Sequence, residues 1–182
     1  MKENLKVTHY NDGTQIPIIT DNTEWSNLST PAYCWYNNDE ATNKNLYGAL
    51  YNWYTVNTGN ICPVGWHVPT NDDWTILTSY LGGENVAGGK IKSTRTVPEL
   101  PPSWNSPNNG ATNESSFSAL PAGKRYENGV YNYIGDNTYW WSSTSGSDLN
   151  AGYRNLYYNE VYVFSGFNNK KSGYSIRCVS NY

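Results

Sequence analysis

Few residues in this chain could serve as an acid, a base or a nucleophile. The only histidines are His9 and His67, and neither has an obvious serine or cysteine nucleophile near it in the sequence. His67 stands in GWHVPT at the start of an expected helix, where an imidazole more commonly satisfies backbone groups. His9 lies in THYND, where we expect an edge strand before a turn. The histidines therefore point away from nucleophilic and acid–base catalysis.

The acidic residues form no recognisable catalytic pair. Glycoside hydrolysis requires two carboxylates that flank the scissile bond. The acids that would have to converge for this purpose are Glu99, Glu114, Glu127 and Asp136. Nothing in their spacing demands that convergence, so we predict that the chain is not an enzyme.

The residue types that bind metal ions are also sparse. Calcium takes about six to eight oxygen ligands, usually with several carboxylates among them. A polar run that could contribute is Asn71, Asp72 and Asp73, but helix capping explains this run better than a metal site. We predict no metal site and no cofactor, with a structural calcium ion as the alternative.

The chain contains three cysteines, Cys34, Cys62 and Cys178. Three cysteines are too few for a disulfide scaffold, and no CxxC spacing indicates a metal site. Two arrangements are open on this pattern alone, namely one disulfide with a leftover thiol and three buried free thiols.

The stretch NEVYVFSGFNN, residues 159–169, indicates binding rather than catalysis. Side chains alternate across a strand, so we expect an inner set formed by Leu156, Tyr158, Val161 and Val163. The outer set would then be Asn155, Tyr157, Asn159, Glu160, Tyr162 and Phe164. Tyrosine supplies rigid contact area, and asparagine, serine and glycine supply adaptable hydrogen bonds. The alternative is that these aromatic side chains cover a small sheet or a neighbouring domain.

We therefore predict a ligand-binding face within residues 145–169. Its apolar contacts would come from Tyr153, Tyr157, Tyr162, Phe164 and Phe167. Its hydrogen bonds would come from Asp148, Asn150, Asn155, Asn159, Glu160 and Asn168.

Composition excludes several classes of protein. The 182 residues suit one domain, residues 1–182. With 12 basic and 15 acidic residues, the net charge of −3 argues against a nucleic-acid partner and against a polybasic membrane anchor. An aromatic content of 15% argues against disorder. No apolar run approaches the roughly 20 residues of a membrane span, and MKENLKVTHY lacks the apolar region of a signal peptide.

Two helices are expected in the first half of the chain. Residues 46–56 place Leu46, Leu50, Trp53 and Tyr54 at helical spacing, and Gly59 could end the element. The second helix follows Thr70, which can form a capping box with Asp73. Its buried stripe would be Trp74, Leu77 and Leu81, and Gly82-Gly83 would end it.

The remaining chain predicts loops and short strands. Residues 95–114 hold four prolines and no periodicity, which indicates a long loop that is either functional or pinned by a buried Trp104. From residue 117 onward, short strands alternate with turn residues at intervals of about ten. The predicted fold is α+β, with two helices, short and mostly antiparallel strands, and long loops.

Seven segments appear in an order that resembles a known family. They are ENLKVTHYNDGT, AYCWYNND, YGALYNWYTVNTG, CPVGWHVPTNDDW, NSPNNGATNESSFSALPAG, YWWSST and GYSIRCV. Together they resemble the Fibrobacter succinogenes major paralogous domain from residue 3 to residue 179. The resemblance implies a C-type lectin-like fold, related to the formylglycine-generating enzyme branch. It also implies an extracellular domain at the bacterial cell surface, trimmed from a longer exported protein such as a lipoprotein.

The resemblance bears on the cysteines and on two activities. It implies a Cys62–Cys178 disulfide, because in such folds the last strand lies near the chain's path into the core, and export favours oxidation. The formylglycine-generating relatives depend on two cysteines close together near the C-terminus, whereas this chain has only Cys178 there. The calcium-dependent sugar motifs E-P-N, Q-P-D and W-N-D are missing as well. An oxidase is therefore only a second alternative.

The C-terminal segment also resembles the variable region of ligand-binding proteins that retroelements diversify. In that comparison, the fixed residues would be Trp140, Trp141, Arg154, Leu156, Val161, Lys170, Gly173 and Arg177. We expect a non-catalytic receptor or adhesin whose partner is a protein or glycan on another cell or surface, without nucleic acid and without membrane insertion. The first alternative is a carbohydrate-binding module of a polysaccharide-utilising system, and another is a module that joins subunits; the sequence leaves the oligomeric state open.

Overall fold

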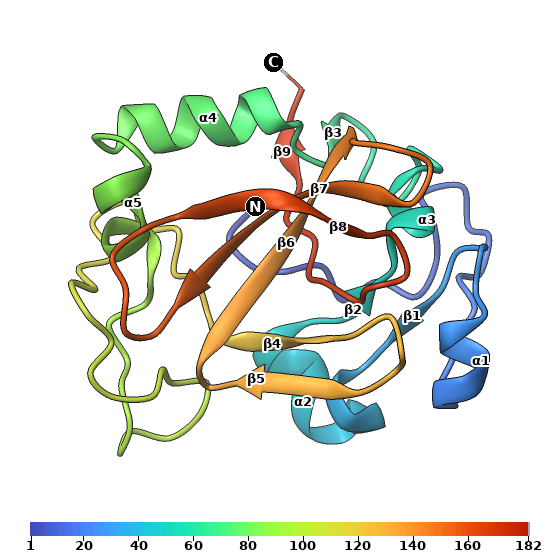
Figure 1. Cartoon of the computed structure of the whole chain (residues 1–182), viewed down its shortest axis with the longest axis horizontal. Coiled ribbons are helices and arrows are strands. Elements are labelled where there is room, and N and C mark those ends of the chain that lie inside the picture. Colours follow the sequence, from blue (N-terminus) through green and yellow to red (C-terminus); the bar gives the residue numbers. More distant parts are fainter. Residues whose placement is uncertain (182) are drawn as a thin grey trace.

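The computed structural model describes residues 1–181, and within them it shows an α+β fold (Figure 1). The helices are α1 (Asn22–Ser26), the 3-10 helix η1 (Tyr36–Asn38), α2 (Glu40–Tyr47), α3 (Trp53–Val56), α4 (Asn71–Tyr80) and α5 (Glu84–Ile91). The strands are β1 (Tyr33–Cys34), β2 (Leu50–Tyr51), β3 (Trp66–His67), β4 (Ala122–Arg125), β5 (Tyr131–Ile134), β6 (Asn137–Ser145), β7 (Asn150–Tyr157), β8 (Phe164–Asn169) and β9 (Val179–Ser180). None of the helices in this part of the chain has the length and apolarity to cross a membrane.

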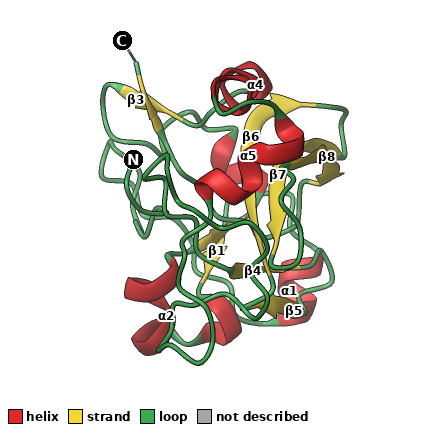
Figure 2. Ribbon diagram, turned by 90° about the vertical axis from the view of Figure 1, so that its left-hand side faces the viewer, coloured by secondary structure: helices red, strands yellow, loops and turns green. Residues whose placement is uncertain are grey.

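A five-stranded sheet of order β5-β4-β6-β7-β8 organises the second half of the chain. Its pairs are antiparallel except β4 with β6. Helices α4 and α5 cover one side of β6 and β7 (Figure 2). There Trp140 and Leu156 belong to the same apolar cluster as Trp74 of α4 and Ile91 of α5. The opposite side carries the tyrosine-rich cluster described below, so each face of the central strands meets a different layer.

The predicted helix after Thr70 is confirmed as α4. The Thr70 hydroxyl accepts a hydrogen bond from the Asp73 amide, and the Asp73 carboxylate accepts one from the Thr70 amide, which completes the capping box. Gly82 and Gly83 follow with φ of 99° each, a conformation that favours glycine and ends the helix.

The predicted helix over residues 46–56 is wrong. The backbone leaves α2 at Gly48, where φ is 80° and where a Cβ would lie 2.6 Å from the carbonyl oxygen of Leu5. The next residues pair as β2 with β1, and only then does the short α3 begin. The spacing of apolar residues gave no indication that the helix ends at Gly48, where the backbone of Leu5 packs closely.

A helix that the pattern did not predict, α5, follows α4 directly. Its sequence ENVAGGKI contains Gly88 and Gly89, and glycine disfavours a helix interior by about 1 kcal/mol. Both glycines are explained by close packing, because a Cβ on Gly88 would collide with the carbonyl of Tyr162 and one on Gly89 with the carbonyl of Gly110. These contacts seat residues 161–162 directly on α5.

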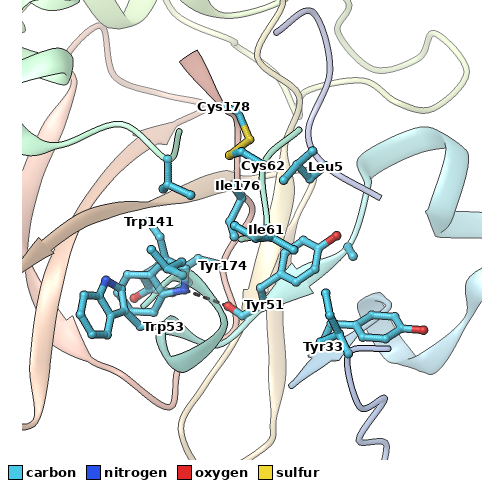
Figure 3. Close-up of a cluster of buried hydrophobic side chains, with 14 of the residues drawn as sticks. Leu5, Tyr33, Tyr51, Trp53, Ile61, Cys62, Trp141, Tyr174, Ile176 and Cys178 are labelled. Carbon is cyan, nitrogen blue, oxygen red and sulfur yellow. Dashed lines mark hydrogen bonds between the residues drawn. A yellow bond between two sulfur atoms is a disulfide. The ribbon is translucent and has the colours of Figure 1, made fainter. Parts of the chain in front are cut away.

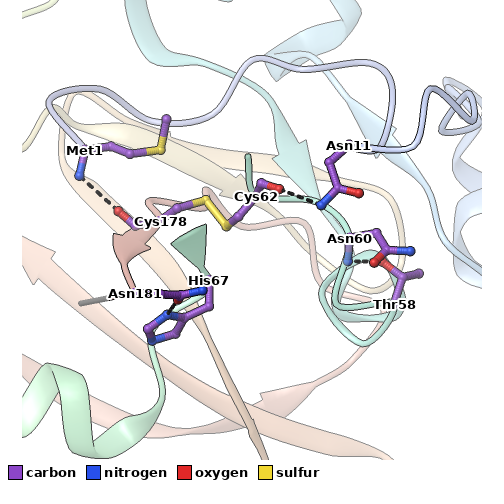
Figure 4. The surroundings of a disulfide bond; sticks show 8 residues. All are labelled: Met1, Asn11, Thr58, Asn60, Cys62, His67, Cys178 and Asn181. Atoms are coloured by element: carbon purple, nitrogen blue, oxygen red, sulfur yellow. Dashed lines mark hydrogen bonds between the residues drawn. A yellow bond between two sulfur atoms is a disulfide. The ribbon is translucent and has the colours of Figure 1, made fainter. Parts of the chain in front are cut away.

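A disulfide bond lies within the largest cluster of buried apolar side chains. Cys62 and Cys178 are bonded with Cα atoms 6.0 Å apart, as the family resemblance implied (Figure 4). In the same cluster, the Trp141 indole donates to the Tyr51 carbonyl at 2.8 Å and lies against Tyr174 (Figure 3). Cys34 is a buried free thiol.

The proline-rich segment 95–114 is a pinned loop. The Trp104 side chain is fully buried, and its indole nitrogen donates to the Ala119 carbonyl at 2.9 Å. Of the two alternatives for this loop, the structure shows the one in which Trp104 anchors it.

Buried tyrosines predict loss of stability at alkaline pH. Burial raises the pKa of Tyr51, Tyr139 and Tyr174 above the ordinary value, whereas tyrosines of the unfolded chain ionise near pH ~10. Because the folded pKa exceeds the unfolded one, stability is complete below pH ~10 and falls as pH rises further. Tyrosinate absorbance should therefore rise in two stages, the second coinciding with loss of the circular dichroism signal. A single transition near pH ~10 in a protein that stays folded would contradict this assignment.

Candidate ligand-binding face

His67 takes part in the start of helix α4. His67 Nε2 lies 3.2 Å from Asp73 Oδ2 at the start of α4, and His67 Nδ1 contacts Asn181. Burial raises the pKa of Asp73, but hydrogen bonds from Thr70 and His67 outweigh it and leave that pKa lowered. The pair therefore belongs to the helix cap.

Three of the four carboxylates considered for hydrolysis have separate partners. Glu114 pairs with Lys90 at 2.9 Å, Asp136 accepts a hydrogen bond from Asn105 at 2.8 Å, and Glu99 accepts one from the Thr96 amide at 3.2 Å. Within residues 1–181, no group of three or more His, Cys, Asp or Glu side chains is placed to hold a metal ion.

The predicted ligand residues fall into three classes of exposure. Exposed side chains are Asp148, Asn159, Tyr162, Phe164 and Phe167. Half-buried ones are Asn150, Tyr153, Tyr157, Glu160 and Asn168, and Asn155 is buried. On the inner side, Leu156 and Val163 are buried as predicted, while Tyr158 and Val161 are half-buried.

The prediction that Asn155 faces a ligand is wrong. Asn155 is 1% exposed and lies in register between Tyr139 of β6 and Phe164 of β8. The alternation rule assumed that one face of this strand meets solvent, but β7 is a central strand with packed layers on both sides. The same layer receives Tyr153, whose ring lies 5.6 Å from that of Tyr174.

Phe164 and Phe167 do not share one face. They stand three residues apart on β8, so their side chains point to opposite sides of the sheet. The Phe164 ring meets those of Tyr157 at 4.9 Å and Tyr162 at 5.9 Å. Phe167 instead packs on Gly146 in the turn between β6 and β7. The predicted face therefore divides into an aromatic surface around Phe164 and a hairpin tip with Asp148 and Phe167.

The aromatic surface extends over three residues that the sequence did not single out, namely Tyr126, Tyr133 and Tyr139. The Tyr133 ring lies 6.4 Å from Tyr139 and 6.3 Å from Tyr126, and the Tyr126 and Tyr133 hydroxyls are 3.1 Å apart. That hydrogen bond, followed by burial, raises the pKa of Tyr126 to about 12. We name as the tyrosine face the set Tyr126, Tyr133, Tyr139, Tyr153, Tyr157, Tyr162 and Phe164. Its β5 part was missed because Tyr133 has φ of 69°, which reorients its side chain and breaks the strand alternation.

A buried lysine fixes the segment that carries the exposed part of this face. Lys92 is fully buried at the end of α5, and its ammonium donates to the carbonyls of Asn109, Tyr157 and Glu160 at 2.9, 3.2 and 2.8 Å. A longer contact of 3.4 Å reaches the Tyr158 carbonyl. Burial lowers the pKa of Lys92 to about 8, so the side chain is charged at neutral pH. Lys92 thus holds the backbone of the turn after β7 from the buried side, while Asn159 and Tyr162 of this turn are exposed.

Comparison with known proteins identifies the family. No curated protein matches this chain, and no solved structure matches it. The family model described as the Fibrobacter succinogenes major domain matches residues 1–180. The chain belongs to the Fibrobacter succinogenes major domain family.

Proposed function

We propose that this domain is a non-catalytic receptor or adhesin that binds a ligand through the tyrosine face, at the bacterial cell surface. The observation that carries the proposal is the exposure of Tyr162 and Phe164, at 41% and 36%, on a segment held by Lys92 and α5. Exposed aromatic groups on a rigid support bind with little loss of entropy. The disulfide is compatible with an extracellular location.

The proposal includes a C-type lectin-like fold and diversification of the C-terminal segment by a retroelement. Support comes from the separation of exposed and buried positions. The residues expected to be fixed are largely buried, namely Trp140, Trp141, Arg154, Leu156, Lys170, Gly173 and Arg177. Between them, Asp148, Asn159, Tyr162, Phe164 and Phe167 are exposed, so substitution there leaves the core untouched.

Replacing both Tyr162 and Phe164 with alanine should weaken ligand binding without unfolding the domain. If these residues are hot spots, we expect each truncation to weaken binding by more than about 1 kcal/mol. The ligand is first identified by probing the labelled domain on glycan arrays, with and without a chelator, and on libraries of proteins and bacterial cells. Affinities of wild type and variant for that ligand are then compared by calorimetry.

Tyr80→Ala is the matched control, because Tyr80 is 87% exposed on α4, away from the tyrosine face. Unchanged affinity in the Tyr162→Ala/Phe164→Ala variant would refute the proposed site. Unfolding of that variant would show that the two rings serve the core. Glycan hits alone would favour the carbohydrate-binding alternative.

A further inference from the structure

Among residues 1–181, one buried cation has aromatic neighbours but no hydrogen-bond acceptor. Six lysine and arginine side chains are less than 9% exposed, namely Lys92, Lys124, Arg125, Arg154, Lys170 and Arg177. Five of them donate to oxygen atoms of the protein. Lys124, which is 8% exposed, has no hydrogen-bond acceptor and no carboxylate within salt-bridge distance among residues 1–181. An ammonium buried without an acceptor is costly unless water or a ligand supplies one.

Aromatic rings surround this ammonium. Its Nζ lies 4.0 Å from the ring centre of Tyr126, 4.7 Å from that of Tyr139 and 5.5 Å from that of Tyr133. The nitrogen is not among the fully enclosed unpartnered atoms of the described chain, so it keeps a narrow contact with solvent. Burial lowers the pKa of Lys124, and Glu127 opposes this effect from a distance. The ammonium thus lies among the rings of the tyrosine face, without an oxygen acceptor among residues 1–181.

Two tyrosine hydroxyl protons near the Lys124 ammonium are also available as hydrogen-bond donors. The Tyr126 and Tyr133 hydroxyls bond to each other, so whichever donates, one proton of that pair stays free. Asn137 donates to the Tyr139 hydroxyl at 3.1 Å, which leaves the Tyr139 proton free as well. These hydroxyls belong to the three rings that border the Lys124 ammonium, and a cation with neutral donors near it suits an anionic oxygen.

Backbone strain points to the same place. Seven non-glycine residues of the described chain have positive φ, and Tyr133, at 69°, is the only one that is neither asparagine nor serine. Opposite it in the ladder, Gly123 also has positive φ, and a Cβ there would meet the Asn132 carbonyl at 2.6 Å. A bulky residue in this conformation costs about 1–3 kcal/mol, and such strain concentrates at ligand sites. Here it holds the Tyr133 ring beside Lys124.

We infer that Lys124, with the hydroxyls of Tyr126, Tyr133 and Tyr139, receives the carboxylate of an acidic sugar lying on the tyrosine face. This inference rests on the proposed function and specifies its ligand. A uronic acid matches all three features, because its carboxylate suits the ammonium, its ring C–H groups suit the tyrosine rings, and its hydroxyls suit the phenol groups. Rings and phenol groups flank the ammonium, which favours a sugar over an acidic peptide.

The test compares glucuronic-acid oligosaccharides with glucose oligosaccharides of equal length by calorimetry. We expect the acidic sugar to bind at least about tenfold more tightly, since a charged hydrogen bond contributes about 1.5–3 kcal/mol. Lys124→Met should remove that preference, whereas Lys90→Met, which changes a half-buried lysine paired with Glu114, should not. Tyr133→Phe keeps the ring, removes one hydroxyl and should weaken binding several-fold, which covers the case in which Lys124→Met fails to fold.

The outcomes separate this inference from the proposed function. The inference would be overturned if the acidic sugar did not bind. It would also be overturned if Lys124→Met and Tyr133→Phe both bound the acidic sugar as tightly as the wild-type domain does. If the Tyr162→Ala/Phe164→Ala variant then lost binding of a neutral sugar, that result would still support the tyrosine face as the ligand-binding site. Conversely, binding could depend on Lys124 and yet persist in the Tyr162→Ala/Phe164→Ala variant. That result would support the anion site at Lys124 and refute the role of Tyr162 and Phe164 in ligand binding. Lys124-dependent binding of a polyglutamate peptide without binding of the sugar would overturn the choice of a sugar.

Discussion

Removal of the Cys62–Cys178 disulfide should lower the free energy of unfolding by about 4–5 kcal/mol. The bond joins residues separated by 116 positions, so it restricts most of the unfolded chain. Two further segments bond to the backbone of the joined residues, because the Met1 amino group donates to the Cys178 carbonyl and the Asn11 side-chain amide donates to the Cys62 carbonyl (Figure 4). A domain with few long helices depends strongly on such a crosslink.

Urea unfolding of a Cys62→Ala/Cys178→Ala variant measures this effect. The experiment is best made in a Cys34→Ala background, since the buried thiol of Cys34 could exchange with the disulfide once the chain unfolds. Cys34→Ala alone is the control, and we expect it to cost about 1 kcal/mol for the small cavity. A double variant that unfolds within about 1 kcal/mol of its background would show that the disulfide contributes little.

Replacing Lys92 with methionine should cost about 3 kcal/mol and should loosen the segment that carries Tyr162 and Phe164. The change leaves the carbonyls of Asn109, Tyr157 and Glu160 without their charged donor, and an unpaired buried carbonyl costs about 1–3 kcal/mol. Hydrogen exchange should accelerate at the Val163 amide, which bonds to the Glu84 carbonyl at 2.9 Å.

Lys90→Met provides the comparison, because it removes a lysine two positions away whose salt bridge with Glu114 is partly exposed. Exposed pairs contribute about 0–1 kcal/mol, so this variant should remain close to wild type in both measurements. Equal stability of the Lys90 and Lys92 variants would mean that Lys92 does not hold the turn.

Local signals in the sequence were sufficient for some elements. The capping box of Thr70 and Asp73 specifies the start of α4 from residues within one helical turn, and the double glycine specifies its end. The disulfide was predictable only from the order of family segments, because nothing local to Cys62 or Cys178 indicates that the two residues meet.

Other features depend on tertiary packing and left no reliable local signal. Gly88 and Gly89 read as helix-breaking residues, yet they are needed so that residues 161–162 and 110 can approach α5. Asn155 looks like a surface residue, but it stands on a central strand and is buried. Exposure of Tyr162 and Phe164 was predicted, whereas the contribution of Tyr126 and Tyr133 required the strand pairing to be known.

The structure separates a supporting framework from the surface that it presents. Lys92 and the glycines of α5 hold the backbone of residues 157–162, and Trp140 and Leu156 fix β6 and β7 on the helices. Side chains that face outward from this framework can change without disturbing it. Such an arrangement suits a binding protein whose ligand differs between variants.

Sequencing the gene segment for residues 145–169 in many cells of the source population would test this account most directly. The account predicts that substitutions cluster at exposed positions such as Asp148, Asn159, Tyr162 and Phe164, trace to template adenines, and spare Arg154 and Leu156. A segment that is invariant, or that varies no more than α4, would contradict it.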